Sequence, residues 1–170
     1  MNIVLTGKTG SGKTTVCLKI LENLKLKNLS FGGVLTPGNF DGSREIIDVC
    51  TGEKLPFCRL RPFSEGAAIG KYFFNEDAFD FGIKAVSRSI DERSAVTFID
   101  ELGPLELSGS GFAGIFRKLN ISAIKNLLLV VRLAILDRMA EKFDFSFRIF
   151  ETTDKTRECL AEEITEVLDK

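Results

Sequence analysis

Apolar residues along this chain follow two alternating patterns. Short continuous runs, typical of buried strands, alternate with longer stretches in which apolar residues recur at every third or fourth position, as in amphipathic helices. The runs predict strands near residues 2–6, 31–36, 95–100, 126–131 and 145–150, and the periodic stretches predict helices near 13–28, 76–91, 111–121, 132–142 and 155–168. Thr153 and Asp154 are placed to cap the last helix. This alternation indicates an α/β fold, in which a mainly parallel central sheet carries helices on both faces.

Two segments interrupt the alternation. Residues 46–49 and 54–57 are strand-like runs on either side of Thr51-Gly52, a pair that suits a tight reversal. We therefore expect a small β-hairpin insertion over residues 45–59. Residues 59–72 contain Pro62, Gly66 and Gly70 and show no periodic pattern of apolar residues, which predicts a long loop. We expect this loop to lie near the ligand site that residues 7–14 indicate below.

The composition is that of one globular domain over residues 1–170. The chain is 44% hydrophobic and 28% charged, which is enough for a core of several buried elements. Its 23 basic and 24 acidic residues leave a net charge of −1. The chain therefore has no excess positive charge to attract nucleic acid or an anionic membrane, and we expect neither as a partner. The longest apolar run, residues 127–131, is too short to span a bilayer.

The four cysteines are Cys17, Cys50, Cys58 and Cys159. They form no C-x-x-C pair, and the chain has no histidine, so a zinc site is not expected. We interpret all four as buried, reduced thiols, and because no signal peptide is recognisable we expect a cytoplasmic location. The oligomeric state is left open, with a monomer as the expectation.

Residues 7–14 match every fixed position of the phosphate-binding motif G-x-x-x-x-G-K-[ST], between a predicted strand and a predicted helix. Glycines let successive backbone N–H groups point at phosphate oxygens, Lys13 adds positive charge near the β and γ phosphates, and the Thr14 hydroxyl is placed to bind Mg²⁺. The expected nucleotide-binding residues are Gly7, Lys8, Thr9, Gly10, Ser11, Gly12, Lys13, Thr14 and Thr15. The motif predicts a protein that binds a nucleotide by its phosphates.

Two adjacent carboxylates, Asp100 and Glu101, end the strand predicted near 95–100. We expect Asp100 to join Thr14 in holding Mg²⁺, and Glu101 to orient the attacking water or to accept its proton. The alternative for Glu101 is a cap or an ion pair at the surface. Glu106, in the loop that follows, either supports this site or has no part in it.

Several arginines could stabilise charge on the γ-phosphate in the transition state. The candidates are Arg59, Arg61, Arg132, Arg138 and Arg157, each of which could instead lie on a solvated face. Arg132 is the first choice because it directly follows a core strand. Residues 109–114 spell G-x-G-x-x-G without a strand leading into them, so we interpret them as a flexible entry to a helix and not as a dinucleotide site.

Three segments together resemble a known family: residues 3–15, the Gly-Gly-Val-Leu-Thr-Pro run at 32–37, and the run Phe-Ile-Asp-Glu-Leu-Gly-Pro-Leu-Glu-Leu at 98–107. They are similar to the small P-loop nucleoside-triphosphatases that include the cancer-related nucleoside triphosphatase and its archaeal and bacterial relatives. The resemblance implies a three-layer, RecA-like P-loop fold and Mg²⁺-dependent hydrolysis of ATP, GTP and other nucleoside triphosphates to diphosphate and phosphate. In it, residues 7–15 bind phosphates and metal, Asp100 is the metal-linked acid and Glu101 the catalytic acid.

The chain departs from the family pattern at three places. Gly38-Asn39-Phe40 replaces a Glu-Val-Arg element, which leaves Arg44 as the nearest basic residue. Pro104 stands where a lysine is frequent, and Thr156-Arg157 replaces an Asn-Arg pair. Two alternatives to the hydrolase stay open: a small-molecule or nucleoside kinase, with its acceptor between residues 59–75 and 104–114, and a nucleotide-dependent switch with slow turnover.

Overall fold

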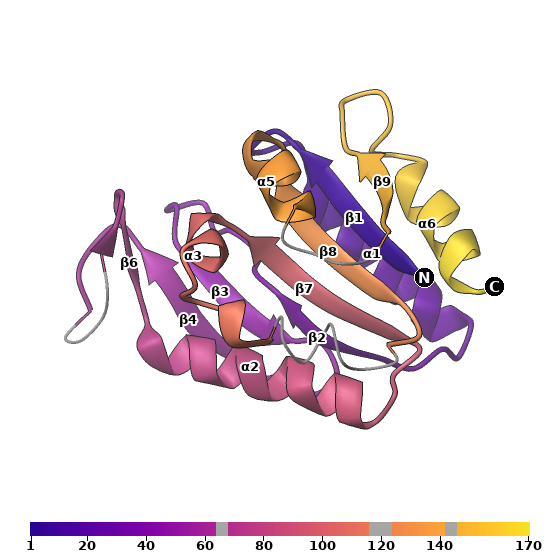
Figure 1. The fold of residues 1–170 in the computed structure, drawn as a ribbon, viewed down its shortest axis with the longest axis horizontal. Coiled ribbons are helices and arrows are strands. Elements are labelled where there is room, and N and C mark those ends of the chain that lie inside the picture. Colours follow the sequence, from indigo (N-terminus) through magenta and orange to yellow (C-terminus); the bar gives the residue numbers. More distant parts are fainter. Residues whose placement is uncertain (64–67, 116–123, 142–145) are drawn as a thin grey trace.

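The computed structural model describes residues 1–63, 68–115, 124–141 and 146–170. Five parallel strands form the centre of its sheet, side by side in the order β2 (Phe31–Leu35), β7 (Val96–Leu102), β8 (Leu127–Arg132), β1 (Asn2–Gly7) and β9 (Arg148–Glu151) (Figure 1). These are the five strands that the apolar runs predict. Because β8 lies between β1 and β7, the strands that lead into the phosphate loop and the acidic pair are not adjacent.

Antiparallel strands extend the sheet beyond β2. They are β3 (Arg44–Asp48), β4 (Lys54–Arg59), β6 (Tyr72–Phe74) and β5 (Ala68–Ile69), so the predicted hairpin over 45–59 is confirmed as part of the same sheet. The loop expected over 59–72 is wrong in its last part. There β5 and β6 pair, because the aromatic residues of β6 add to the edge of β4 and Phe74 packs edge-on against Phe57 at 5.3 Å between ring centroids.

Helices cover both faces of the sheet and make three layers (Figure 1). Helix α2 (Glu76–Asp91) lies on one face, and α1 (Lys13–Leu26) packs with α6 (Leu160–Leu168) on the other. Alternate residues of β8 enter the two cores: Leu129 faces α2, whereas Leu128 faces α1 and α6. This arrangement confirms the predicted α/β architecture.

The predicted helix ends differ from the structure at three places. The helix expected over 132–142 begins later, with a 3₁₀ turn η1 (Leu133–Ile135) followed by α5 (Leu136–Ala140), since β8 continues through Arg132. Helix α6 starts at Leu160 because Thr156 Oγ1 donates to the Glu151 carbonyl at 2.8 Å, which holds the preceding residues in a turn. The expected caps Thr153 and Asp154 therefore lie outside the helix. Of the helix expected over 111–121, residues 113–115 are helical and residues 116–123 lie outside the described part.

Two of the four cysteines contradict the expectation of burial. Cys17 and Cys58 are buried, but Cys50 and Cys159 are exposed, because Cys50 lies in the turn after β3 and Cys159 at the start of α6. All four thiols are free. In the described ranges, no helix is both long enough and apolar enough to cross a membrane.

Candidate nucleotide-binding site

The phosphate-loop motif forms the turn between β1 and α1. Gly7, Gly10 and Gly12 have φ angles of 148°, 79° and 92°, which other residues rarely adopt. A Cβ at Gly7 would also lie 2.7 Å from Ser11 Oγ and from the Thr152 carbonyl oxygen. Gly12 is the N-cap of α1, so the unpaired N–H groups of the first helical turn are available to an anion bound in this loop.

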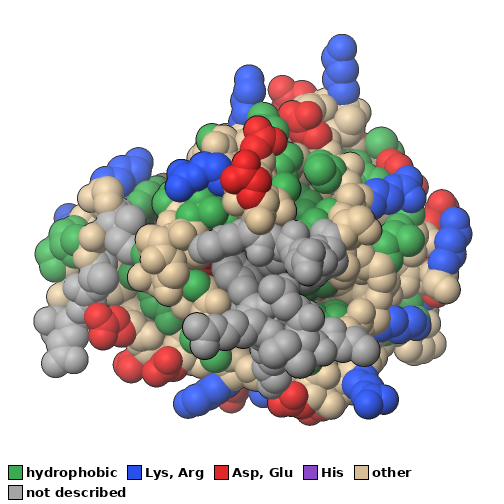
Figure 2. Space-filling view, viewed as in Figure 1, with side chains coloured by type: hydrophobic (Ala, Val, Ile, Leu, Met, Phe, Trp, Pro, Cys, Tyr) green, Lys and Arg blue, Asp and Glu red, His purple; other side chains and the backbone are tan. Residues whose placement is uncertain are grey.

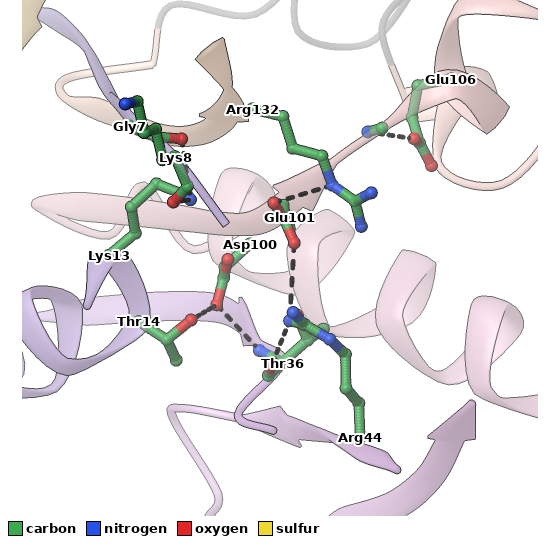
Figure 3. A network of polar contacts seen from close by, with 11 residues as sticks. Gly7, Lys8, Lys13, Thr14, Thr36, Arg44, Asp100, Glu101, Glu106 and Arg132 are labelled. Carbon is green, nitrogen blue, oxygen red and sulfur yellow. Dashed lines mark hydrogen bonds and ion pairs between the residues drawn. The ribbon is translucent and has the colours of Figure 1, made fainter. Parts of the chain in front are cut away.

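Lys13 reaches back into the loop. Its Nζ donates to the carbonyl oxygens of Gly7 at 3.1 Å and Lys8 at 2.9 Å, and its side chain is buried (Figure 3). Burial lowers the pKa of Lys13, while the nearby carboxylates of Glu101 and Asp100 raise it. The lysine charge is thus held beside the expected phosphate position and within electrostatic reach of both acids.

The other predicted loop residues surround this position. Residues 8–11 line a pocket together with Glu151, the last residue of β9, and residues 152–154, which follow it. Thr15 and Gly12 line a second, smaller pocket with Lys19 and Arg157. The structure therefore brings all the predicted phosphate-loop residues, 7–15, to one end of the parallel strands.

Asp100 is the fully buried acid of the site. Its Oδ2 accepts hydrogen bonds from Thr14 Oγ1 at 3.0 Å and from the Thr36 backbone N–H at 3.1 Å (Figure 3). Burial raises the pKa of Asp100 to about 6, partly offset by the hydrogen bond from Thr36. Its other oxygen, Oδ1, has no hydrogen-bond partner among the described residues, and neither has the buried Thr36 hydroxyl.

These oxygens fit a magnesium ion. Mg²⁺ prefers hard oxygen ligands and commonly takes one or two from the protein and the rest from phosphates and water. The unpaired Asp100 Oδ1 and the Thr14 hydroxyl supply such oxygens beside the phosphate loop. Across the described ranges no group of three or more acidic, cysteine or histidine side chains could hold a metal by itself, so a cation here would depend on the nucleotide.

Glu101 lies between two arginines. Arg132 Nε donates to Glu101 Oε1 at 3.0 Å, and Arg44 Nη1 lies 3.5 Å from Glu101 Oε2 (Figure 3). Arg44 Nη1 also donates to the Thr36 carbonyl at 3.0 Å, which ties the arginine to the Asp100 side of the site. The Glu101 side chain is only 10% exposed, so its ion pairs are not those of a surface residue.

Arg44 and Thr36 were absent from the predicted site residues. In the sequence Arg44 is only the basic residue nearest to an altered family element, yet in the structure it reaches Glu101 of the acidic pair because β3 folds back antiparallel on β2. Thr36 directly follows β2, within the run at 32–37 on which the family resemblance partly rests. Its position directly after β2, a strand next to β7, was the signal that could have identified Thr36, whereas no local pattern marks Arg44.

The other candidate arginines lie elsewhere. Arg59 donates to the carbonyls of Arg61 and Pro62 on the antiparallel extension, and Arg138 is exposed on α5. Arg157 pairs with Glu158 at 3.4 Å, beside Gly12 and away from the acidic pair. Arg132 is the predicted arginine that the structure places against Glu101.

Glu106 has a structural position near the site. Its buried carboxylate accepts hydrogen bonds from the backbone N–H groups of Gly103 at 2.7 Å and Phe112 at 3.1 Å, and burial raises its pKa. Figure 3 shows it apart from the Asp100 and Glu101 carboxylates. It ties the start of α3 (Pro104–Leu107), a short helix not predicted from the sequence, to the turn at 109–112, so it supports the site by shaping this loop.

A pocket of about 350 Å³ opens on the outer side of Glu101. Thr36, Arg44, Glu101 and Arg132 lie at its polar part, and its remaining walls come from β4, β6 and α3. None of the phosphate-loop residues lines it. Glu101 thus lines this pocket, and its charge also raises the pKa of Lys13 in the phosphate loop.

Charges of both signs are mixed on the molecular surface. Figure 2 shows Lys and Arg interspersed with Asp and Glu over the described part of one face, without a broad basic patch there. This distribution agrees with the net charge of −1. The described part of this face therefore lacks the clustered Lys and Arg side chains that are typical of nucleic-acid-binding proteins.

Comparison with known proteins gives a consistent picture. A family model described as NTPase matches residues 2–165. Nucleoside-triphosphatase THEP1 of Archaeoglobus fulgidus is 31% identical over 174 residues, which cover 99% of this chain and 99% of that protein. Nucleoside-triphosphatase THEP1 of Methanocaldococcus jannaschii is 31% identical over 170 residues, covering 96% and 95%.

Solved structures share the fold. The crystal structure of THEP1 from Aquifex aeolicus gives a TM-score of 0.80 at 25% identity over 100% of both chains. The solution structure of a human cancer-related nucleoside triphosphatase gives a TM-score of 0.76 at 22% identity over 98% of this chain and 96% of that one. These likenesses confirm the three-layer P-loop fold, and with the family match over nearly the whole sequence they show that this chain belongs to the NTPase family.

Proposed function

We propose that this protein hydrolyses nucleoside 5′-triphosphates, including ATP and GTP, to diphosphate and phosphate in a Mg²⁺-dependent reaction. The observation that carries the proposal is the Glu101 carboxylate, which two arginines hold directly after Asp100, the acid that accepts a hydrogen bond from Thr14 of the phosphate loop. Membership of the NTPase family and relatives named nucleoside-triphosphatase support the same reaction.

The phosphate loop would bind the β and γ phosphates by its backbone N–H groups and the N-terminus of α1. Lys13 would turn its ammonium from the carbonyls of Gly7 and Lys8 to phosphate oxygens, which carry full negative charge and are stronger acceptors. Its charge then offsets the negative charge that develops on the leaving diphosphate.

Thr14 and Asp100 would hold the Mg²⁺ that accompanies the nucleotide. When bound, the ion supplies positive charge that stabilises the transferring phosphoryl group. Asp100 is prepared for this role because Oδ1 is buried without a partner among the described residues, while Thr14 and the Thr36 amide fix Oδ2.

Glu101 would accept a hydrogen bond from the attacking water and take its proton as the bond from oxygen to phosphorus forms. Arg132 and Arg44 fix the direction of the carboxylate from either side. Arg132 would also stabilise charge on the γ-phosphate, the role of an arginine supplied within the same chain.

The test is phosphate release from ATP, GTP, CTP and UTP with Mg²⁺. We expect Glu101→Gln and Lys13→Ala each to lower the rate by roughly 100-fold or more. Glu162→Gln, the same change at an exposed site on α6, should leave the rate unaltered. Nucleotide binding without release above the Glu101→Gln background would reject the hydrolase and favour the switch protein. Release that persists undiminished in Glu101→Gln would reject the role assigned to Glu101.

A further inference from the structure

The pocket outside Glu101 is larger than hydrolysis requires. It has a volume of about 350 Å³, whereas one water molecule occupies about 30 Å³ in the liquid. A single attacking water on Glu101 would therefore fill only a small part of this pocket, and none of the phosphate-loop residues that would hold the triphosphate lines it. Its volume lies at the lower end of the range for small-molecule sites, roughly 300–1,000 Å³.

The wall of this pocket is apolar and aromatic. Phe57 and Phe74 form a packed ring pair, and Tyr72 and Leu105 add apolar surface from β6 and α3. Phe57 is buried and Tyr72 and Phe74 are half-buried, so the wall is built on strands and not on a loose loop. Such a surface favours the ring or hydrocarbon body of an organic molecule over water alone.

The charged groups of the pocket favour an anion. Three basic side chains line it, Arg44, Arg132 and Lys71, against two acids, Glu101 and Glu106. Both arginines contact Glu101, and Glu106 is engaged by two backbone N–H groups. Lys71 lies over the Tyr72 ring at 5.3 Å and has no ion pair with an acid in the described ranges. Its charge at the aromatic wall is available to a carboxylate or phosphate group.

We propose that this pocket binds a second substrate, a small organic anion with an apolar body and an alcohol group, and that the alcohol replaces water as the acceptor of the γ-phosphoryl group. The inference rests on the proposed function, since it uses the same bound triphosphate and the same Glu101. It assigns to the antiparallel extension of the sheet a binding role that hydrolysis does not need.

The transfer follows the same path as hydrolysis. The alcohol oxygen forms a bond to the γ-phosphorus, and the bond from that phosphorus to the β–γ bridging oxygen breaks. The hydroxyl proton passes to the Glu101 carboxylate, and the electron pair stays on the leaving nucleoside diphosphate. The products are a phosphate monoester and a nucleoside diphosphate, so no further reactant is required.

The test uses two matched probes, 4-(hydroxymethyl)benzoate and 4-methylbenzoate. Both carry a ring and a carboxylate, but only the first carries an alcohol. Binding is measured by saturation-transfer NMR at millimolar concentration, and products from ATP and Mg²⁺ are followed by ³¹P NMR. We expect both probes to bind, the alcohol to yield a phosphate monoester, and the methyl compound to slow phosphate release by excluding water.

Two variants locate the binding site. Lys71→Glu reverses the free charge and should weaken both probes by about tenfold, whereas Lys84→Glu, the same change at an exposed position of α2, should not weaken them. Tyr72→Ala removes part of the apolar wall at a strand near the sheet edge and should also weaken binding. Neither Lys71 nor Tyr72 belongs to the hydrolytic machinery, so phosphate release without probe should be unchanged in both.

Absence of binding, or equal binding to the native protein, Lys71→Glu and Tyr72→Ala, would overturn the site. Binding of both probes with no monoester from the alcohol would overturn the transfer. Phosphate release without probe, measured in the same samples, separates these results from failure of the proposed function. Release that persists while the probes fail leaves the hydrolase standing, and absence of release rejects the hydrolase itself.

Discussion

Asp100 makes the stability of this protein depend on pH. Its pKa is about 6 in the folded chain, against an ordinary value of 3.8. Because the folded state binds this proton more tightly than the unfolded chain, protonated Asp100 favours folding. That contribution is complete below about pH 3.8 and is lost as the pH rises through about 6. A shift of about two pKa units corresponds to about 3 kcal/mol of unfolding free energy.

Asp100→Asn removes this dependence without changing the shape of the side chain. The amide oxygen can still accept the hydrogen bonds from Thr14 and the Thr36 amide, and no charge is buried. We expect the free energy of unfolding at about pH 8 to rise by up to about 3 kcal/mol, with little change at about pH 4. Phosphate release should be lost, because the variant no longer supplies a charged ligand for Mg²⁺.

The assay is urea unfolding followed by circular dichroism at several pH values between about 4 and 8. Asp80→Asn, an exposed acid of α2, is the matched control and should leave the pH dependence unchanged. Mg²⁺ added together with a nucleotide should stabilise the native protein beyond the effect of the nucleotide alone at the upper end of this range, where Asp100 is ionised, and should give Asp100→Asn no such added stability. An Asn variant that is less stable than the native protein at about pH 8, or that keeps the native pH slope, would refute the reasoning.

Of two further predictions, the first concerns the arginines that hold the Glu101 carboxylate and the second concerns the packing of Gly111 against Glu106. Arg44→Gln and Arg132→Gln should each lower kcat, measured as steady-state phosphate release, by roughly tenfold or more. In the double variant the loss of transition-state stabilisation should be smaller than the sum of the two single losses. Fully additive losses would mean that the two arginines act separately. Gly111→Ala should lower the unfolding free energy by about 2 kcal/mol or more, because φ is 59° and a Cβ would lie 2.3 Å from Glu106 Oε1. Gly114→Ala, with open space at its Cβ, is the urea-unfolding control, and equal stability of the two variants would contradict the steric explanation.

The parts of the fold that were predicted correctly are those with strong local patterns. The continuous apolar run at 127–131 is buried on both faces of the sheet, as is typical of a central parallel strand. The glycines and lysine of the phosphate loop fix their own geometry, so their positions followed from the motif. The adjacency of Asp100 and Glu101 to this loop followed from the rule that parallel strands present their carboxyl ends at one edge.

The missed features depend on contacts between distant segments. Arg44 reaches Glu101 only because β3 returns antiparallel beside β2, a pairing that no local pattern specifies. The strands β5 and β6 are two and three residues long, too short for a period to be seen. The late start of α6 follows from side-chain hydrogen bonds of Thr153 and Thr156, which compete with the helix for the same residues.

The two halves of the sheet supply different parts of the site, so substitutions in one half can alter one part while the other part stays the same. The sheet's parallel half supplies the phosphate loop and the acidic pair, which are the groups that any transfer of a γ-phosphoryl requires. Its antiparallel half supplies Arg44 and most of the aromatic wall of the pocket beyond Glu101. In the proposed reaction, in which Glu101 takes the proton of the acceptor, the identity of the acceptor would be decided by what the antiparallel half admits to that carboxylate. Substitutions on β4 and β6 should therefore alter the choice between water and a larger acceptor while the affinity for the triphosphate stays unchanged.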